Sequence, residues 1–497
     1  MRDWLKREPI IIVAGQGAVL RDARGREYLD ANSSVWTNLH GHKHPALNAA
    51  IVRQLERIAH SSALGLANEP ASLLAERLVA AANPAPLGVA AGPPLRKVFF
   101  SDDGSTAMEV ALKLAYAFAR RTGRSRQPRF LSLEGAYHGD TVGAVALGHI
   151  DLFHGAYSGL LFRADQVMAP YCYRCRFNRA KPERADARDY RRCRWECLRR
   201  LEQKFDTQNK KGNAYAGFVF EPLVQGAAGM IPQPAGWLRR AAEIARAHGA
   251  LLIADEVMTG FGRTGNIAAN SAVLDPPRPR SRLCPRNHLE SAATFEDEDD
   301  FEARALSGES GPPSLFASHH EQVQPDFLAL AKGLTGGYLP MAATLGTEEI
   351  FGAFLGEYEE FKTFFHGHSF TANQLGAAAA LASLDLLERP AAVRARRQLE
   401  SILSQELKSL WPLAHVGDIR QIGLVAAVEL VREWRTREPF DLREQAGIRV
   451  CEAMARRGVL TRPVGNVIVL MPPYCTTADQ ARRMVRVLGE AISELGR

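Results

Sequence analysis

The side chains of this 497-residue chain that could do chemistry stand at the ends of short apolar runs. LLIAD ends at Asp255, where a buried carboxylate would be costly without a cationic partner. DFLALA precedes Lys332, and a lysine at a strand end can form a Schiff base where its surroundings favour the neutral amine. Gly104, Ser105 and Thr106 follow KVFF and offer backbone N–H groups and hydroxyls that suit a phosphate. The set is completed by Tyr137, His138 and Glu221.

A phosphate cradle, a buried carboxylate and a strand-end lysine together are what pyridoxal phosphate requires. The carboxylate keeps the pyridine nitrogen protonated, which makes the ring an electron sink, and an aromatic side chain would stack on the ring. Each signal is weak alone, because Gly-Ser at a helix start is more often a plain cap and a Lys before Gly is usually solvated. Their combination in this order predicts a cofactor site with Lys332, Asp255 and Tyr137 as catalytic residues.

An α/β domain must position these residues. From about 95 to 380, short apolar strands such as RFLSL and GFVFEP alternate with longer amphipathic helices. Ligands in open α/β sheets lie beyond the carboxyl ends of the strands. The spacing of Thr106 and Glu109 predicts a capping box, and Gly123 is expected to stop the helix that it starts. The apolar face of that helix is expected to comprise Met108, Ala111, Leu112, Ala115 and Phe118.

The pattern predicts two domains. Residues 61–375 would form a large cofactor-binding domain, and residues 376–497 would form a smaller α+β domain together with residues 1–60. Two insertions, 171–212 and 271–322, interrupt the large domain. The second contains PPRPRSR and EDEDD without sustained periodicity, which predicts a mobile surface segment.

Composition excludes several classes of protein. Hydrophobic residues make up 46% and charged residues 24%, as in an ordinary soluble enzyme. No apolar run approaches the ~18 residues of a membrane-spanning helix, and the N-terminal apolar stretch is too short for a secretory signal. Seven cysteines in so long a chain favour a reducing compartment over a disulfide framework. A soluble cytoplasmic protein is expected.

The excess of positive charge is local. Residues 171–204 hold 12 of the 62 basic residues and 5 of the 55 acidic ones, which leaves 50 of each elsewhere. A general nucleic-acid or membrane surface is therefore not expected. The same segment contains Cys172-x2-Cys175 and Cys193-x3-Cys197, close to zinc-ligand spacing. A structural metal and reduced, unliganded thiols both remain open.

Two segments carry a family resemblance. LLIADEVMTGFGRTG, followed by LALAKGLTGGYLPMAA, resembles the class III aminotransferases, which are fold-type I pyridoxal-phosphate enzymes. The resemblance covers nearly the whole chain. It implies an aspartate-aminotransferase-like α/β fold, with a large domain built on a mixed, mostly parallel sheet flanked by helices and a smaller α+β domain. It also implies a homodimer, because the active site in this fold is shared between subunits.

Within the class, SSVWTNLHGHKHP, AYHGDTVGA and TRPVGNVIVLMPPY are most similar to the branch that aminates 8-amino-7-oxononanoate in biotin synthesis, with S-adenosylmethionine as amino donor. The resemblance implies that Lys332 carries the cofactor and that Asp255 faces its pyridine nitrogen. Gly104, Ser105 and Thr106 would hold the phosphate, Tyr137 would stack on the ring, and Ser369 would reach the neighbouring subunit's phosphate. The implied substrate-binding residues are Trp36, Tyr137, Lys332, Gly367 and Arg462.

Two departures leave alternatives open. The family usually begins with a Trp-His-Pro-aromatic-Thr segment that covers the substrate, whereas this chain starts at MRDWLKREP. Either the natural start lies upstream or the pocket closes differently. The phosphate segment reads His366-Gly367-His368-Ser369, which resembles the branch that uses lysine as donor. The same reaction with lysine as donor therefore stays an alternative. An ω-amino acid or 4-aminobutyrate transamination is a second alternative, because such enzymes share the cofactor site.

Overall fold

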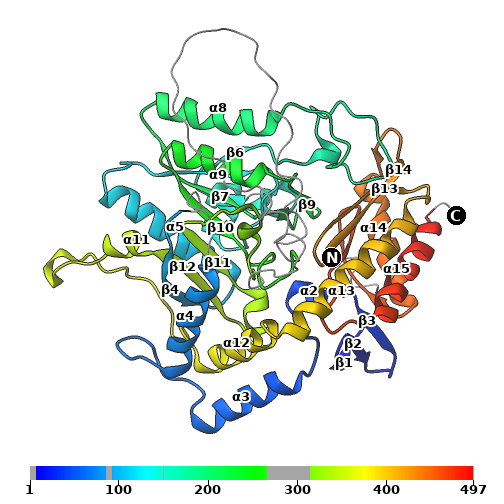
Figure 1. The fold of residues 1–497 in the computed structure, drawn as a ribbon, viewed down its shortest axis with the longest axis horizontal. Helices are drawn as coiled ribbons and strands as arrows, with labels where there is room; N and C mark the ends of the chain where they lie inside the picture. The colour runs from blue at the N-terminus through cyan, green and yellow to red at the C-terminus, as the bar shows by residue number, and fades with distance from the viewer. Residues whose placement is uncertain (1–6, 85–91, 149, 266–313, 496–497) are drawn as a thin grey trace, which may run out of the picture.

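A seven-stranded sheet forms the centre of the large domain in the computed structural model, which describes residues 7–84, 92–148, 150–265 and 314–495 (Figure 1). Strand β12 runs antiparallel to both of its neighbours, and the other neighbouring strands are parallel. The predicted mixed, mostly parallel sheet is thereby confirmed. In sheet order the strands are β4 (Leu95–Ser101), β12 (Ala342–Thr347), β11 (Phe327–Leu330), β10 (Leu251–Asp255), β7 (Tyr215–Phe220), β5 (Arg129–Leu133) and β6 (Asp165–Val167).

The central strands are continuous apolar runs because helices cover both faces of the sheet. Every residue of β7 and β10 is buried. Phe218 and Phe220 face a core shared with α4 (Glu69–Ala82), α8 (Glu196–Lys210) and α9 (Trp237–Ala247). Val219 faces the opposite core, which is shared with α5 (Gly104–Arg121) and α6 (Val142–Gly148). Successive residues of one strand therefore anchor different helical layers.

Helix α5 confirms the predicted apolar face, whose five residues are all buried, but it starts differently from the prediction. Its N-cap is Asp103, which accepts a hydrogen bond from Thr106 N at 2.8 Å, while Thr106 Oγ1 accepts one from Asp103 N at 3.0 Å. The predicted box of Thr106 with Glu109 is wrong, since Glu109 instead accepts from Gly143 N. An aspartate before a Gly-Ser pair is the better cap because its carboxylate reaches the third free N–H.

The smaller domain contains a five-stranded sheet of C-terminal strands, with helices packed against it (Figure 1). The N-terminal strands β1 (Ile12–Gln16), β2 (Val19–Asp22) and β3 (Glu27–Asp30) form a separate sheet with β16 (Val459–Leu460). The other elements of this domain are β13 (Val416–Ile422), β14 (Val425–Glu433), β15 (Glu438–Pro439), β17 (Pro463–Val464), β18 (Val467–Leu470), α13 (Pro390–Leu407), α14 (Ala446–Arg456) and α15 (Ala478–Ser493).

The packing sets different domain limits from those predicted. Helix α12 (Gln374–Leu387) packs against α3 (Pro45–Arg57) and α4, and its buried residues belong to the large-domain core. The chain therefore passes into the small domain after Leu387, not after residue 375. The remaining short elements are α2 (Ser33–Trp36), α7 (Asp151–His154), α11 (Glu348–Gly352), β8 (Val224–Gln225) and β9 (Ile231–Pro232).

Both predicted insertions are shorter than expected where the structure describes them. Helix α8, inside the predicted 171–212 insertion, buries Leu201 and Phe205 in the large-domain core. In the 271–322 segment, Leu315, Phe316 and the neighbouring residues are likewise buried, so 314–322 is not a surface loop. Residues 271–313 lie outside the described residues. None of the described helices is long and apolar enough to cross a membrane.

Candidate active site

A cavity of about 450 Å³ opens at the carboxyl ends of β7, β10 and β11. The parallel register pairs Ala254 with Phe220 and Asp255 with Ala329, which brings the polar residues that follow these strands to one level. The α5 N-terminus and the residues after β5 close the same space. Of the residues that the sequence singled out, the cavity is lined by Trp36, Gly104, Ser105, Tyr137, His138, Glu221, Asp255 and Lys332.

Asp255 is held by two neighbours. Its Oδ2 lies 2.7 Å from His138 Nδ1, and its Oδ1 accepts a hydrogen bond from Val257 N at 3.1 Å. Burial would lower the pKa of His138, but the hydrogen bond and charge of Asp255 outweigh it and the pKa is raised. His138 Nε2 is buried and finds no hydrogen-bond partner among the described residues. These two contacts fix the orientation of the Asp255 carboxylate in the cavity lining.

Glu221 is a second buried carboxyl group beside this pair. Its oxygens accept hydrogen bonds from Tyr137 N at 3.3 Å and Gly226 N at 2.7 Å. Burial raises the pKa of Glu221 to about 7, with a further rise from Asp255 and an opposing effect of His138. The side chain is therefore shared between its two protonation states near neutral pH.

Lys332 lies two residues beyond the end of β11, with its Nζ 5.6 Å from the Trp36 ring centre. Burial lowers the pKa of Lys332, against the attraction of Asp255, Glu221 and Asp103. A lowered pKa favours the neutral amine that the sequence argument requires. Its backbone φ is +31°, a value that side-chain-bearing residues rarely adopt and that is found at functional sites. We call Asp255, His138, Glu221 and Lys332 the site centre.

The start of α5 has the geometry of an anion site. A helix leaves its first N–H groups outside the intrahelical ladder, and here the capping box uses that of Thr106. Gly104 and Ser105, both at the cavity wall, present the preceding N–H groups. Gly139 packs so closely that a Cβ there would lie 2.1 Å from Ser105 Oγ, and Asp140 N donates to that hydroxyl. The cradle fits a small dianion such as a phosphate.

Tyr137 lines the same cavity. Its hydroxyl donates to Asp140 Oδ2 at 2.8 Å, and its ring is nearly parallel to that of His154, 13° apart in plane. Burial and the Asp140 hydrogen bond raise the pKa of Tyr137, so the phenol stays protonated. Its backbone N–H donates to Glu221, and its predicted stacking on a cofactor ring stays a prediction.

Four predicted site residues do not line the cavity. Thr106 is used in the helix cap. Gly367 and Ser369 are exposed, and the Ser369 carbonyl lies 2.9 Å from His60 Nε2. Arg462 is exposed in the loop between β16 and β17. Their predicted roles stay predictions.

Sequence reasoning missed most of the residues that line the cavity, and three of them shape it directly. Asp103 caps α5, and its place before Gly-Ser-Thr was the available signal. Gly139 and Gly226 allow close packing: a Cβ on Gly226 would lie 2.7 Å from Met258 Sδ and 3.5 Å from the Trp36 ring. No sequence pattern reveals such contacts, because they form between distant segments.

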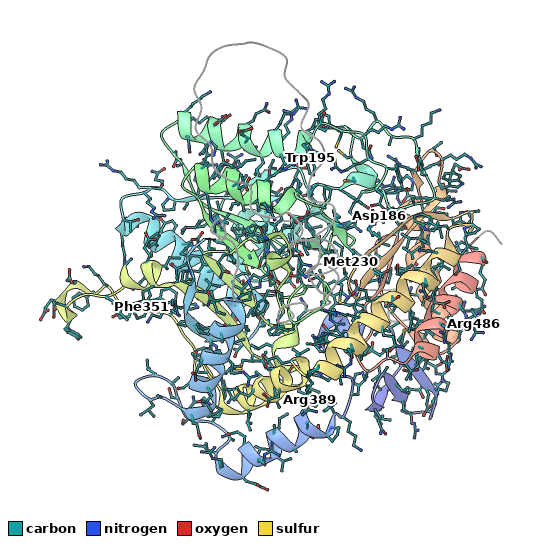
Figure 2. The ribbon with its side chains drawn as sticks, viewed as in Figure 1. Asp186, Trp195, Met230, Phe351, Arg389 and Arg486 are labelled. Carbon is teal, nitrogen blue, oxygen red and sulfur yellow. The ribbon has the colours of Figure 1, made fainter. Side chains whose placement is uncertain are left out.

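The cysteine-containing segment 171–195 crosses from the large domain to the small-domain sheet (Figure 1). Figure 2 shows Asp186, on this segment, and Met230, at the end of the cavity-lining loop, near the junction of the two domains. The four cysteines line one small void, where Arg191 Nη1 lies 3.4 Å from Cys193 Sγ. Among the described residues, no group of three or more His, Cys, Asp and Glu side chains is arranged to hold a metal ion.

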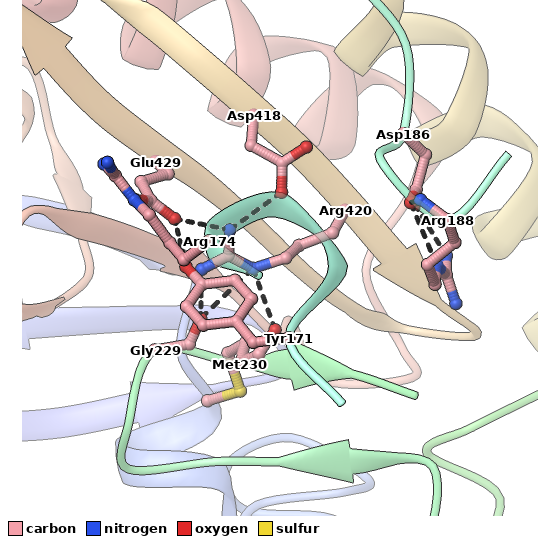
Figure 3. Close-up of polar contacts among 9 residues, drawn as sticks. All are labelled: Tyr171, Arg174, Asp186, Arg188, Gly229, Met230, Asp418, Arg420 and Glu429. Atoms are coloured by element: carbon pink, nitrogen blue, oxygen red, sulfur yellow. Dashed lines mark hydrogen bonds and ion pairs between the residues drawn. The ribbon is translucent and has the colours of Figure 1, made fainter. Parts of the chain in front are cut away.

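Hydrogen bonds and ion pairs of two arginines, Arg174 on this segment and Arg420 on β13, connect the large domain to the small domain (Figure 3). Arg420 Nη1 lies 2.9 Å from Asp418 Oδ2 and 2.7 Å from Glu429 Oε2, and Arg420 Nε donates to Met230 O at 2.9 Å. Arg174 Nε donates to Glu429 Oε1 at 2.8 Å, and Tyr171 also bonds to Glu429. Burial raises the pKa of Asp418 to about 7, against the attraction of Arg420. We call Asp418, Arg420, Glu429, Arg174 and Tyr171 the junction centre.

The comparisons with known proteins agree with this geometry. The class-III aminotransferase family model matches residues 3–277 and 307–492. The chain belongs to the class-III aminotransferases. The unmatched residues 278–306 fall within the predicted 271–322 insertion. The predicted family and fold are both confirmed.

Individual aminotransferases match over the whole chain. The adenosylmethionine-8-amino-7-oxononanoate aminotransferase of Geobacter sulfurreducens is 43% identical, over 99% of this chain and 94% of its own. The crystal structure of the Methanocaldococcus jannaschii enzyme of the same name has a TM-score of 0.80 at 34% identity, covering 99% of this chain and 95% of its own. An amine transaminase from an uncultivated Pseudomonas species, bound to pyridoxal phosphate, has a TM-score of 0.80 at 30% identity, covering 99% and 96%. Pyridoxal phosphate is thereby supported as the cofactor, and the anion cradle and the oriented Asp255 fit it.

Proposed function

We propose that this aminotransferase converts 8-amino-7-oxononanoate to 7,8-diaminononanoate in biotin synthesis, with S-adenosylmethionine as amino donor. The observation that carries the proposal is the 43% identity over nearly the full length to an enzyme of that name, and a cavity lined by Tyr137, Asp255 and Lys332 supports it. Relatives of the same name from Nitratidesulfovibrio vulgaris and Anoxybacillus flavithermus, at 43% and 40% identity, support the same reading.

Pyridoxal phosphate supplies, when bound, an electron sink that stabilises negative charge on the carbon bearing the amine. The N–H groups of Gly104 and Ser105 would hold its phosphate, and Tyr137 would stack on its ring. Asp255 would keep the pyridine nitrogen protonated. His138 keeps the Asp255 carboxylate in that orientation through the 2.7 Å contact.

Lys332 Nζ is the group that moves the substrate proton. Because burial favours its neutral form, the amine can accept a proton from the amine-bearing carbon and return it. A positioned acid–base group contributes about 10²–10⁴-fold to such a step. The Trp36 ring lies 5.6 Å from Lys332 Nζ and would help to keep water from the reacting atoms.

Two substrate contacts lie outside the described cavity. Arg462 is proposed to bind the carboxylate of 8-amino-7-oxononanoate, because its bidentate fork suits a carboxylate and its segment resembles the family's substrate segment. Gly367 is proposed to contact substrate from the exposed 366–369 segment.

The proposal is tested by following the visible absorbance of the cofactor-loaded protein. S-adenosylmethionine, lysine, 4-aminobutyrate and β-alanine are added separately. We expect S-adenosylmethionine to bleach the band and 8-amino-7-oxononanoate to restore it. Bleaching by lysine instead changes the donor, and bleaching by 4-aminobutyrate or β-alanine with recovery only by pyruvate or 2-oxoglutarate overturns the proposed reaction. That outcome would favour the amine-transaminase branch, which the Pseudomonas neighbour represents.

We also propose that the enzyme is a cytoplasmic homodimer in which Ser369 reaches the partner's phosphate. The support is that Ser369 is exposed and lies outside the cavity of its own chain, beside exposed Phe365 and Phe370. Mixing Lys332→Ala subunits with Ser369→Glu subunits should restore activity that each variant lacks alone. Failure of the mixture, with dimers shown by ultracentrifugation, would contradict a shared site.

A further inference from the structure

Helix α2 (Ser33–Trp36) is a single left-handed turn. Ser33, Ser34, Val35 and Trp36 have φ values of 47°, 48°, 65° and 71°, and none of them is glycine. Trp36 N donates to Asn32 O at 2.8 Å, so the turn is closed by a helical hydrogen bond. Left-handed backbone is unfavourable for every L-residue and most of all for a β-branched one such as Val35. Four such residues in a row persist only where the surroundings force them.

Several of the hydrogen bonds that hold the turn meet at Asp30, the last residue of β3, which is 2% exposed, and Ser33 Oγ adds one to Met471 O at 2.6 Å. Asp30 Oδ1 accepts hydrogen bonds from Asn32 N at 3.2 Å and Ser34 N at 3.1 Å. Its Oδ2 accepts from Ser34 Oγ at 3.1 Å and lies 3.0 Å from His42 Nε2. Only an ionised carboxylate can accept all four bonds. Consistent with this, these bonds outweigh burial and lower the pKa of Asp30.

The turn ends at a wall of the cavity. Trp36 Nε1 donates to Asn32 Oδ1 at 2.8 Å, which fixes the indole, and the ring covers Lys332 Nζ. A relaxed right-handed backbone would carry the indole away from Lys332. His42 extends the support, because its Nδ1 lies 2.9 Å from Asn38 Nδ2, and Asn38 packs against Gly337 of the cavity lining.

We propose that Asp30 is a positioning residue for the transamination site, since it holds the left-handed turn that sets Trp36 against Lys332 and so shapes the substrate pocket. The proposal rests on the proposed function for the identity of the substrate, but not for the geometry of the turn. Asp30 lies outside the cavity lining and acts through Trp36.

The chain offers a matched control. Asp22, at the end of β2, is also 2% exposed and accepts hydrogen bonds from Arg24 N, Arg26 N and Tyr28 OH, each at 2.9 Å. Asp22→Asn therefore disturbs an equally buried carboxylate without touching the turn. Asp30→Asn keeps the size of the side chain but places a donor amide where His42 and Ser34 donate.

The first measurement needs no substrate. The fluorescence difference between wild type and Trp36→Phe reports the surroundings of Trp36. We expect this difference spectrum to shift when measured in the Asp30→Asn background and to stay unchanged in the Asp22→Asn background. An unchanged spectrum in the folded Asp30→Asn protein would overturn the proposal, whatever the substrate of the enzyme.

The second measurement determines KM and kcat separately for the cofactor-loaded enzyme, to show which of them the variant changes. Asp30→Asn should raise KM for 8-amino-7-oxononanoate about tenfold, the scale of a lost packing contact, with little change in kcat. Combining it with Trp36→Phe should add nothing to the effect of Trp36→Phe alone, because both act through one side chain. Equal effects of Asp30→Asn and Asp22→Asn, or additive effects in the double variant, would reduce Asp30 to a structural role. If wild type does not turn over this keto acid, the proposed function fails and the fluorescence result still decides the role of Asp30.

Discussion

The site centre and the junction centre are both buried groups of opposite charges, but they are completed differently. In the junction centre the Arg420 guanidinium bonds to two carboxylates and to main-chain oxygens, and a second arginine neutralises Glu429 (Figure 3). Each centre has one buried polar atom without a hydrogen-bond partner among the described residues, Asp418 Oδ1 or His138 Nε2, and one carboxyl group whose pKa is raised to about 7. The residues of the site centre, however, line the cavity, and the pKa of Lys332 there is lowered. A buried network whose hydrogen bonds are almost all made within the chain holds domains together. A buried network that lines a cavity and has an atom without a hydrogen-bond partner there is suited to binding a ligand.

The largest effect that this contrast predicts concerns Lys332. Lys332→Ala should lower turnover by at least about 10⁴-fold, because the acid–base group and the cofactor's attachment point are lost together. The exposed Lys204→Ala on α8 is the control and should leave turnover unchanged. Steady-state assays on the folded proteins decide it, and near-normal turnover without added amine would refute the role of the site centre.

Removing the cation of the junction centre should destabilise the fold instead. Arg420→Met leaves Asp418 and Glu429 buried without their main partner, which costs about 3–5 kcal/mol of unfolding free energy. Urea titration at pH 7 measures it. Arg443→Met, which breaks the exposed pair with Asp441, should cost less than about 1 kcal/mol. Equal losses in the two variants would show that the junction centre carries no special stability.

Glu221 should make the stability of the protein depend on pH. Its pKa is raised from 4.5 when unfolded to about 7 when folded, so the folded state binds the proton more tightly. This favourable contribution is complete below pH 4.5 and is lost as the pH rises through about 7. Glu221→Gln should remove about 3 kcal/mol of that pH-dependent difference, measured by urea titration at pH 4.5 and pH 8. The exposed Glu243→Gln is the control and should leave the difference in unfolding free energy between the two pH values unchanged. The same result for Glu221→Gln would contradict the burial argument.

The smallest effect is expected at the cysteines. Cys193→Ser should change the unfolding free energy by less than about 0.5 kcal/mol, because Cys193 is only partly buried and contacts Arg191. Elemental analysis should find no stoichiometric zinc or iron in the wild type. Bound metal that is lost with Cys193→Ser would instead make this segment a second chemical centre.

The order of polar residues after apolar strands sufficed to predict the fold class and the charged residues at the centre of the cavity. Asp255, Glu221 and Lys332 were found because parallel strands end at one edge of a sheet, so sequence position after a strand predicts place in space. The α5 cap was misassigned because two residues with capping-box spacing competed with Asp103, and only the backbone geometry distinguishes them. The insertion limits were wrong because a short buried segment such as 314–322 carries too little periodicity to be recognised.

The sequence by itself determined the alternation of strands and helices in the large domain and the kind of cofactor site, since these depend on local residue types and their spacing. The tertiary structure alone decided the left-handed turn at Trp36, the pairing of His138 with Asp255 and the closure of the junction centre. Each of these depends on groups far apart in the chain, where burial makes a hydrogen bond or a charge pair far more consequential than it is in water.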